Sequence, residues 1–265
     1  MAPQPLNRIT PNCAVNFDPR KLLNSPHITV YPMTVIATWA FIDDILARLL
    51  SQMMKSDLSI GLAMFQALKS QESQRSAVLG AAEKALPLDH FRLLQAIWKV
   101  TKPSRDRRHE YAHHLWGIPD SIPNALALLD PKDSLRDLAA EHEWQQAHEK
   151  RIEDLKEWDR WASIYHPYRP RPEPFNEPKP PVVDRSRIMI FRDNDLRDDE
   201  RDARSALEHF ANFQFAIRNN SPGDAIHQRL LVVPEIEQAF RALSDETPPS
   251  QPQSPQPKGP SGPQQ

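Results

Sequence analysis

Apolar side chains recur at helical spacing through much of the first half of the chain. From Met33 to Met54 they occupy every third or fourth position: Val35, Trp39, Ile42, Leu46, Leu49 and Met53. This spacing indicates an amphipathic helix. Residues 57–69 and 76–101 show the same pattern. Pro87 is expected to bend or split the second of these helices, because proline lacks an amide donor and clashes with the preceding turn.

The second half continues the helical pattern with a higher density of charge. Residues 132–165 keep an approximate apolar stripe through one long charged helix. Residues 187–191 (RIMIF) suit a short strand or an extended packing segment, and 195–218 and 226–243 again have helical periodicity. Because almost no other stretch alternates with the period of a strand, the chain is predicted to be all-α.

Prolines, 27 against 6 glycines, mark where these helices stop. They gather near the N-terminus, in HPYRPRPEPFNEPKPP, and in the final residues, whose composition cannot form a core and predicts disorder. The predicted organisation is an irregular N-terminal arm (1–32), a helical bundle (33–130), a long helix (131–165), a semi-rigid proline-rich linker (166–186), a C-terminal helical segment packing on the bundle (187–245) and a disordered tail (246–265).

The composition says more about the compartment in which the protein works than about its activity. The formal net charge of the 265 residues is −2, so bulk charge gives no argument for nucleic acid or for an anionic membrane. No run approaches the roughly 20 apolar residues of a membrane helix. The first residues (MAPQPLNRITPN) lack the apolar core of a signal peptide. Cys13 is the single cysteine, which excludes an intramolecular disulfide and fits a reducing compartment. We therefore expect a cytoplasmic protein without a membrane partner.

The densest chemistry lies in residues 105–117, RDRRHEYAHHLWG, which hold three arginines and three histidines. The sequence predicts Ser104 as the N-cap of a short helix here and Gly117, followed by Pro119, as its C-cap. The segment is therefore predicted to be a short helix after the sharp break at Lys102-Pro103, because the residue before a proline avoids the helical region.

This helix carries the groups that metal-free RNA cleavage requires. Attack of a ribose 2′-OH on the adjacent phosphate needs a base that titrates near neutrality, which histidine supplies, and a cation for the phosphoryl charge, which arginine supplies. We assign His113 as general base or acid, Arg108 as the phosphate contact, and His109 as the group that orients the substrate or the second histidine. Arg108 and His113 are separated by about 140° around a regular helix, which favours a composite site built by two copies.

One run in this segment resembles the signature of the HEPN domain family, and it reads Arg108-His109-Glu110-Tyr111-Ala112-His113. That signature is an arginine, then a polar residue, then a histidine after four to six residues in total. The resemblance covers roughly residues 33–130. It implies a small helical bundle that dimerises around a metal-independent endoribonuclease site, in toxin–antitoxin, anti-phage or RNA-processing settings. It also implies that an acid of the first helix, Asp43 or Asp44, faces the signature.

The expected partners follow from this reading. Lys102, Arg105 and Arg107 would bind the RNA backbone in a salt-sensitive manner, with Tyr111 and His114 as further neighbours of the substrate. A second copy of the chain would complete the site, and an antitoxin or another protein would be a further partner. No metal or other cofactor is expected.

Two other readings of the same residues stay open. His109-Glu110-Tyr111-Ala112-His113 is also an H-E-x-x-H sequence, in which two histidines one turn apart hold Zn²⁺ and the glutamate activates water, as in a zinc metallopeptidase. The neighbouring arginines count against a dication, and no third histidine follows at the spacing of the extended motif. In the other reading, the chain is a non-catalytic helical dimer that binds a protein or a nucleotide as a scaffold.

Overall fold

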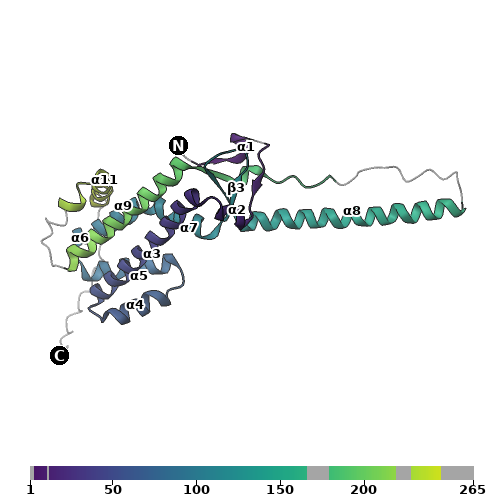
Figure 1. Ribbon diagram of the computed structural model, residues 1–265. Helices are drawn as coiled ribbons and strands as arrows, with labels where there is room; N and C mark the ends of the chain where they lie inside the picture. The colour runs from purple at the N-terminus through teal and green to yellow at the C-terminus, as the bar shows by residue number, and fades with distance from the viewer. Residues whose placement is uncertain (1–2, 11, 166–178, 219–227, 246–265) are drawn as a thin grey trace, which may run out of the picture. The chain divides into compact units, whose positions relative to one another are not determined.

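The computed structural model describes residues 3–10, 12–165, 179–218 and 228–245. Of these, 75% are helical and 8% lie in strands, so the predicted all-α class is confirmed (Figure 1). None of the helices within these ranges combines the length and the apolar composition needed to cross a bilayer.

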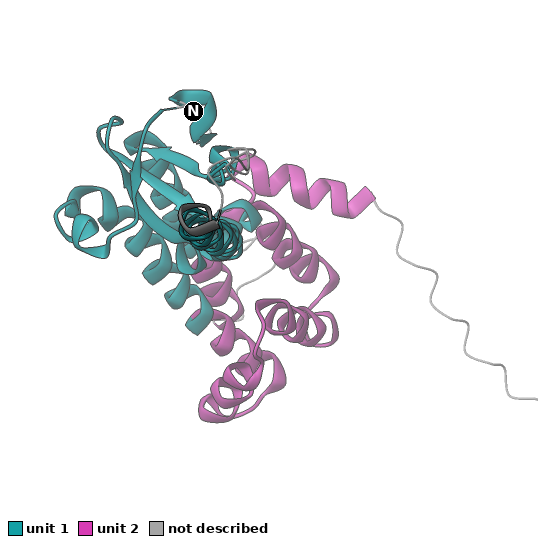
Figure 2. Ribbon diagram, turned by 90° about the vertical axis from the view of Figure 1, so that its right-hand side faces the viewer, with its two compact units in different colours: residues 1–44, 101–208 teal, residues 45–100, 209–265 magenta. Residues whose placement is uncertain are grey.

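The chain folds into two compact units, which Figure 2 colours separately. Unit 1 consists of residues 1–44 and 101–208, and unit 2 of residues 45–100 and 209–265. Two long helices, α3 (Pro26–Met54) and α9 (Asp193–Arg218), contribute to both. The range 33–130, which the sequence groups as one bundle, is therefore distributed over the two units.

Unit 1 contains a small antiparallel sheet with the strand order β1-β5-β4-β3-β2. Its strands are β1 (Gln4–Pro5), β2 (Val15–Asn16), β3 (Leu115–Pro119), β4 (Ala125–Leu129) and β5 (Met189–Arg192). Every residue of β4 is buried, as expected for a continuous apolar run at the centre of a sheet. β5 confirms the strand expected near residues 187–191.

The N-terminal arm is more ordered than predicted. In place of an irregular segment over residues 1–32, the chain forms β1, α1 (Leu6–Ile9), β2, α2 (Pro19–Leu23) and the start of α3. Leu6 and Cys13 are buried in an apolar cluster with residues of β4 and β5. The prediction failed because β1 pairs with β5 and β2 with β3, and pairing across such sequence distances leaves no local pattern.

α3 begins at Pro26, seven residues before Met33, where the first helix was expected to start. The difference includes Pro32. Pro32 lies inside the helix and removes one backbone donor. The helix nevertheless continues because its inward face on both sides of Pro32 is buried, at Ile28 and Val35. The predicted core positions of this helix are all buried: Val35, Trp39, Ile42, Leu46, Leu49 and Met53.

The helix that carries the histidines, α7 (Lys102–His113), starts and ends earlier than predicted. Its N-cap is Thr101, and Ser104 is instead buried inside the helix, where its hydroxyl accepts a hydrogen bond from Trp39 Nε1 at 3.1 Å. Gly117 is not the C-cap but pairs with Ala127 in the sheet. A Cβ on Gly117 would lie 2.7 Å from Val15 Cγ1, so the absence of a side chain allows β2 to lie close to β3 here.

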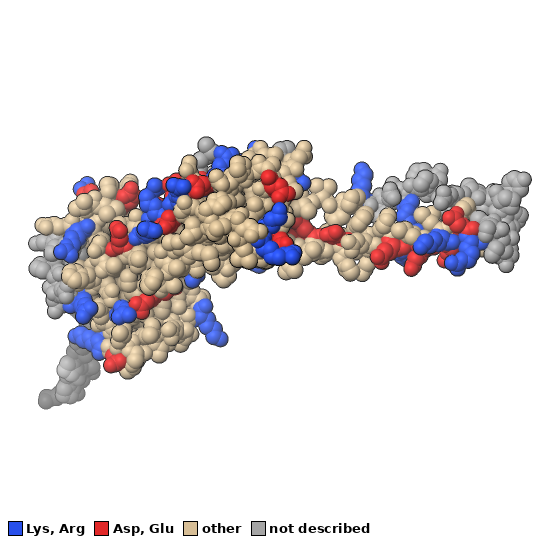
Figure 3. Space-filling view, in the orientation of Figure 1, with Lys and Arg blue, Asp and Glu red and all other residues tan. Residues whose placement is uncertain are grey.

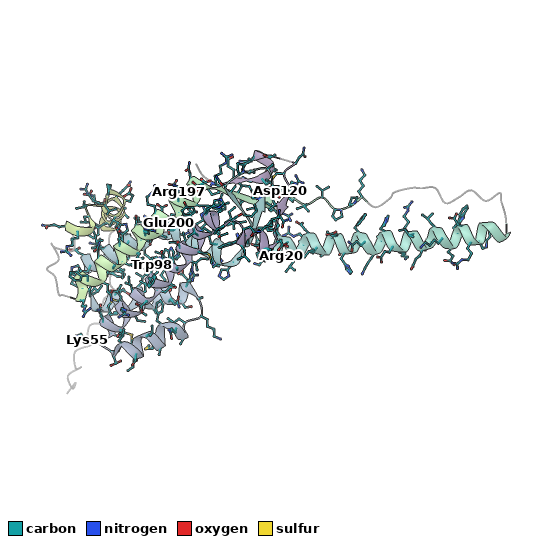
Figure 4. All side chains as sticks on the ribbon, viewed as in Figure 1. Arg20, Lys55, Trp98, Asp120, Arg197 and Glu200 are labelled. Atoms are coloured by element: carbon teal, nitrogen blue, oxygen red, sulfur yellow. The ribbon has the colours of Figure 1, made fainter. Side chains whose placement is uncertain are left out.

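Unit 2 consists of α4 (Leu58–Ala67), α5 (Gln71–Ala85), α6 (Leu88–Val100), α11 (Pro234–Asp245) and the adjoining parts of α3 and α9. The predicted break at Pro87 is confirmed, since α5 ends two residues before it and α6 begins directly after it. α11 packs on α6, and the Trp98 ring (Figure 4) meets Phe210 edge-on at 5.3 Å between centroids.

The long charged helix is confirmed as α8 (Pro131–Tyr165), which is uninterrupted in Figure 1. In Figure 3, basic and acidic side chains are mixed on the visible face of α8 and gather toward its C-terminal end. Near its start, Arg187 Nη1 lies 3.6 Å from Asp133 and 3.8 Å from Asp137, which ties the helix to the segment before β5. The predicted tail (246–265) and most of the predicted linker (166–186) lie outside the described residues.

Two helical glycines of unit 2 give a matched test of the packing. Gly61 of α4 is buried, and a Cβ there would lie 2.8 Å from Ser51 Cα, whereas a Cβ on Gly80 of α5 meets nothing within 4 Å. We expect Gly61→Ala to lower the free energy of unfolding by about 1–3 kcal/mol through overpacking. Gly80→Ala should raise it by about 0.5–1 kcal/mol, because alanine loses less conformational entropy in a helix. Urea unfolding of both variants measures this difference, and equal effects would contradict the packing described.

Candidate functional site

A network of polar groups fixes the inner side of α7 within unit 1. The Tyr111 side chain is buried, and its hydroxyl donates a hydrogen bond to Asp199 of α9. Arg107 donates to Glu110, its Nε lies 3.1 Å from Asp199, and its guanidinium sits 4.7 Å above the centre of the Phe191 ring. These contacts connect α7 to both β5 and α9, and they set the rotation of the helix about its axis.

The protonation states in this network follow from burial. Burial is the main cause that raises the pKa of Asp199, although the Tyr111 hydroxyl and Arg107 oppose it. Burial also raises the pKa of Tyr111, and the neighbouring carboxylate of Asp199 raises it further. Tyr111 therefore stays protonated and acts as the donor to Asp199.

The variant Tyr111→Phe tests this network, and we expect its effect on stability to depend on pH. We expect a loss of about 1–3 kcal/mol in the free energy of unfolding, because the partly buried carboxylate of Asp199 loses a donor. The raised pKa of Asp199 means that its ionised form is disfavoured in the folded state, and the Tyr111 bond favours that ionised form. The loss should therefore be largest above the pKa of Asp199 and shrink as the pH falls through it. Urea unfolding at successive pH values measures this.

The control for that prediction is Tyr31→Phe, which retains the ring that Arg197 faces at 5.7 Å. It should change stability little at any pH. A Tyr111→Phe cost that stays constant, or grows as the pH falls, would contradict the assigned hydrogen bond.

Arg108 lies on the side of α7 that faces α3. Its Nη2 is 4.0 Å from Asp43 Oδ2, with side-chain exposures of 21% and 33%. Burial raises the pKa of Asp43, and Arg108 partly offsets this. Arg108 Nε is buried and has no hydrogen-bond partner among the described residues. The guanidinium is thus held beside a carboxylate, and only part of it reaches solvent.

The two histidines of the signature stand together on the outer side of α7. His109 and His113 are both exposed, and their ring centroids are 4.5 Å apart with an interplanar angle of 53°. Their spacing of four residues places them on adjacent turns of one face. Imidazole is a common general acid or base, so an exposed pair of this kind is a candidate for proton transfer.

The remaining predicted site residues fall into different environments. Lys102 forms an ion pair with Asp106 at the start of α7, and Arg105 is largely buried with its Nε 3.9 Å from Asp106. His114 and Asp44 are half-buried. Asp43 is therefore the acid for which the structure gives a contact with Arg108.

Arg107 and Tyr111 were predicted to contact the substrate, and the structure places their polar groups elsewhere. Both are committed to the inner network with Asp199 and Glu110. Sequence reasoning also missed Phe191 and Asp199, which orient α7. The only local signal for Asp199 was the acid-rich start of its helix, a pattern that also suits a solvent-exposed face.

The described part of the chain does not supply a complete set of zinc ligands. His109 and His113 supply two imidazoles, but no group of three or more His, Cys, Asp or Glu side chains in that part is placed to hold a metal ion. Glu110, which would activate the water, is paired with Arg107. The geometry therefore suits proton transfer better than metal ligation.

The sequence and the structure were compared with known proteins, and no match was found. The chain matches no protein-family model, no curated protein and no solved structure.

Proposed function

We propose that this chain is a HEPN-type endoribonuclease that cleaves RNA without a metal ion. The observation that carries the proposal is the arrangement on α7. Arg108 is held against Asp43 on one side, and His109 and His113 present an imidazole pair to solvent on another. One short helix thus offers a phosphate-binding cation on one side and candidate proton-transfer groups on another.

The reaction is an internal transfer at phosphorus. A neutral histidine takes the proton from a ribose 2′-OH, and the oxygen forms a bond to the adjacent phosphorus. The bond from phosphorus to the 5′-oxygen of the next nucleotide breaks, and that oxygen receives a proton from an acid. The products are a 2′,3′-cyclic phosphate and a free 5′-hydroxyl, so no oxidant, reductant or metal is consumed.

In this proposal His113 is the general base or acid, and His109 orients the substrate or the second histidine. Arg108 stabilises the negative charge that grows on the phosphoryl oxygens, which is often the largest single catalytic contribution. Asp43 positions Arg108. Lys102 and Arg105, at the start of the same helix, contribute to binding the RNA backbone.

The proposed active form is a homodimer with a composite site. Arg108 and His113 are separated by about 140° around a regular helix, so one copy directs them away from a single point. Two copies related by a two-fold axis would bring the arginine of one chain toward the histidine of the other. In a toxin–antitoxin or anti-phage setting, an antitoxin would inhibit by covering these exposed histidines.

A non-catalytic dimeric scaffold is the second candidate. Lys102 is ion-paired and Arg105 is largely buried, so less positive charge is left to bind an RNA backbone, which favours the scaffold. A DNA strand that contains a single ribonucleotide separates the two. The ribonuclease must cut directly after that ribonucleotide and leave a cyclic phosphate, because only there is a 2′-OH present. Binding without cleavage would support the scaffold, and cleavage at deoxynucleotides would exclude the proposed chemistry.

A further inference from the structure

We propose that an apolar groove at the C-terminal end of α7 binds an unpaired nucleobase of single-stranded RNA, next to the phosphate that is cut. This inference rests on the proposed ribonuclease function and adds the form of the substrate. The groove lies within unit 1 and has a volume of about 400 Å³, within the range of small-molecule sites.

Four segments build the groove. α7 and β3 contribute Tyr111, Leu115 and Trp116, α2 and the residues before it contribute Phe17 and Leu22, and α3 contributes Ile36. Its walls are apolar and aromatic. Trp116 is fixed by a hydrogen bond from its Nε1 to the Tyr111 carbonyl oxygen at 2.9 Å, so the indole is held in place before a ligand arrives.

The position of the groove links it to the candidate site. Ala112 and His114 also line it, and they flank His113 in the sequence. His113 itself is exposed and belongs to the pair with His109. A nucleotide with its base in the groove would therefore carry its ribose and phosphate out past the end of α7, toward the imidazoles.

Charge at the rim suits a polyanion. Arg20 and Lys21 lie beside Pro19 and Leu22 in α2, and both are exposed (Arg20 is labelled in Figure 4). Asp18 pairs with Arg20 at 2.8 Å and also interacts electrostatically with Lys21, so the two cations exceed this acid by one positive charge. An apolar floor with aromatic rings, one polar histidine and a cationic rim is the combination that binds a base by stacking and its phosphate by charge.

A single-stranded substrate follows from the same features. A base inside a duplex is stacked and paired, and it reaches a groove of this kind only when it is unstacked. Stacking on aromatic rings is tolerant of base identity, because every base has a π-face. We therefore expect preference for unpaired RNA with little dependence on sequence.

The experiment uses the full chain and a single-stranded 2′-O-methyl oligonucleotide that contains 2-aminopurine, whose fluorescence is quenched by stacking. The missing 2′-OH prevents cleavage, so binding is measured alone. Ala112→Trp fills the groove from an exposed helical position. Loss of one stacked base should weaken Kd by roughly 5- to 150-fold. Ala139→Trp, at an exposed position of α8 that does not line the groove, is the matched control and should bind as the wild type does.

Leu115→Ala is a second variant that trims the groove wall, in case Ala112→Trp folds poorly, and it should also weaken binding and quenching. Undiminished quenching in folded Ala112→Trp and Leu115→Ala, or equal quenching with a fully paired duplex, would overturn the groove proposal. His113→Ala separates the two proposals. If natural RNA is cleaved only by the wild type and quenching is absent from both proteins, the groove proposal fails and the ribonuclease stands. If both proteins quench the fluorescence and neither cleaves natural RNA, the groove proposal stands and the ribonuclease proposal fails.

Discussion

His113→Ala is expected to cleave RNA about 10²–10⁴-fold more slowly than the wild type, the usual contribution of a positioned general acid or base. The imidazole is exposed, and the ring it contacts belongs to His109, which is exposed as well, so its removal should not unfold the chain. The expected signature is a fall in kcat with RNA affinity nearly unchanged, because the group acts on a proton in the transition state. Single-turnover cleavage of a labelled RNA measures the rate, and anisotropy with an uncleavable strand measures the affinity.

The matched control for this variant is His142→Ala. His142 is an exposed histidine of α8, hydrogen-bonded to Gln146 at 2.8 Å, and it belongs to no candidate site. It should cleave RNA at the wild-type rate. If His113→Ala retained full activity, or if both variants lost activity equally, His113 would not be the proton-transfer group.

Arg108→Ala is expected to lower kcat by about 10²–10³-fold, the cost of removing one preorganised donor from a developing anion. Arg108→Lys should recover only part of the rate, because lysine is a point charge without the planar fork of arginine. Asp43→Asn keeps Arg108 but removes the carboxylate that lies 4.0 Å from its Nη2. Its loss should be smaller, because Asp43 acts only by positioning the arginine.

Arg204→Ala provides the matched control for the arginine. Arg204 also pairs with a carboxylate, Glu200 of α9, but it is 66% exposed and lies outside the site. It should leave cleavage unchanged. An Asp43→Asn variant as inactive as Arg108→Ala would contradict the division of roles between the two residues. Full recovery of the rate by Arg108→Lys would contradict the need for a planar cation.

The helices could be predicted from the sequence, because their signals are local. Apolar residues every third or fourth position identified α3, and Pro87 marked the break between α5 and α6. The sheet could not be predicted in the same way. β1 pairs with β5 across most of the chain, and its two residues, Gln4 and Pro5, carry no strand pattern.

The candidate site was partly predictable for the same reason. The signature on α7 is a contiguous run, and Asp43 was one of two acids named to face it. The groups that orient α7 were not predictable, because Phe191 and Asp199 follow the helix by about 80 residues and meet it only in the folded state. Helix caps were misplaced at Ser104 and Gly117 because tertiary contacts, with Trp39 and with β2, outweighed local preference.

The most direct measurement of the central claim is cleavage of a labelled single-stranded RNA by the purified wild-type chain in excess EDTA, with analysis of the product ends. The account predicts cleavage that is unaffected by the chelator and that leaves 2′,3′-cyclic phosphate and 5′-hydroxyl ends. Cleavage that disappears in EDTA and returns with added Zn²⁺ would contradict it and favour the H-E-x-x-H reading of His109 and His113. No cleavage under either condition would leave α7 as part of a binding scaffold.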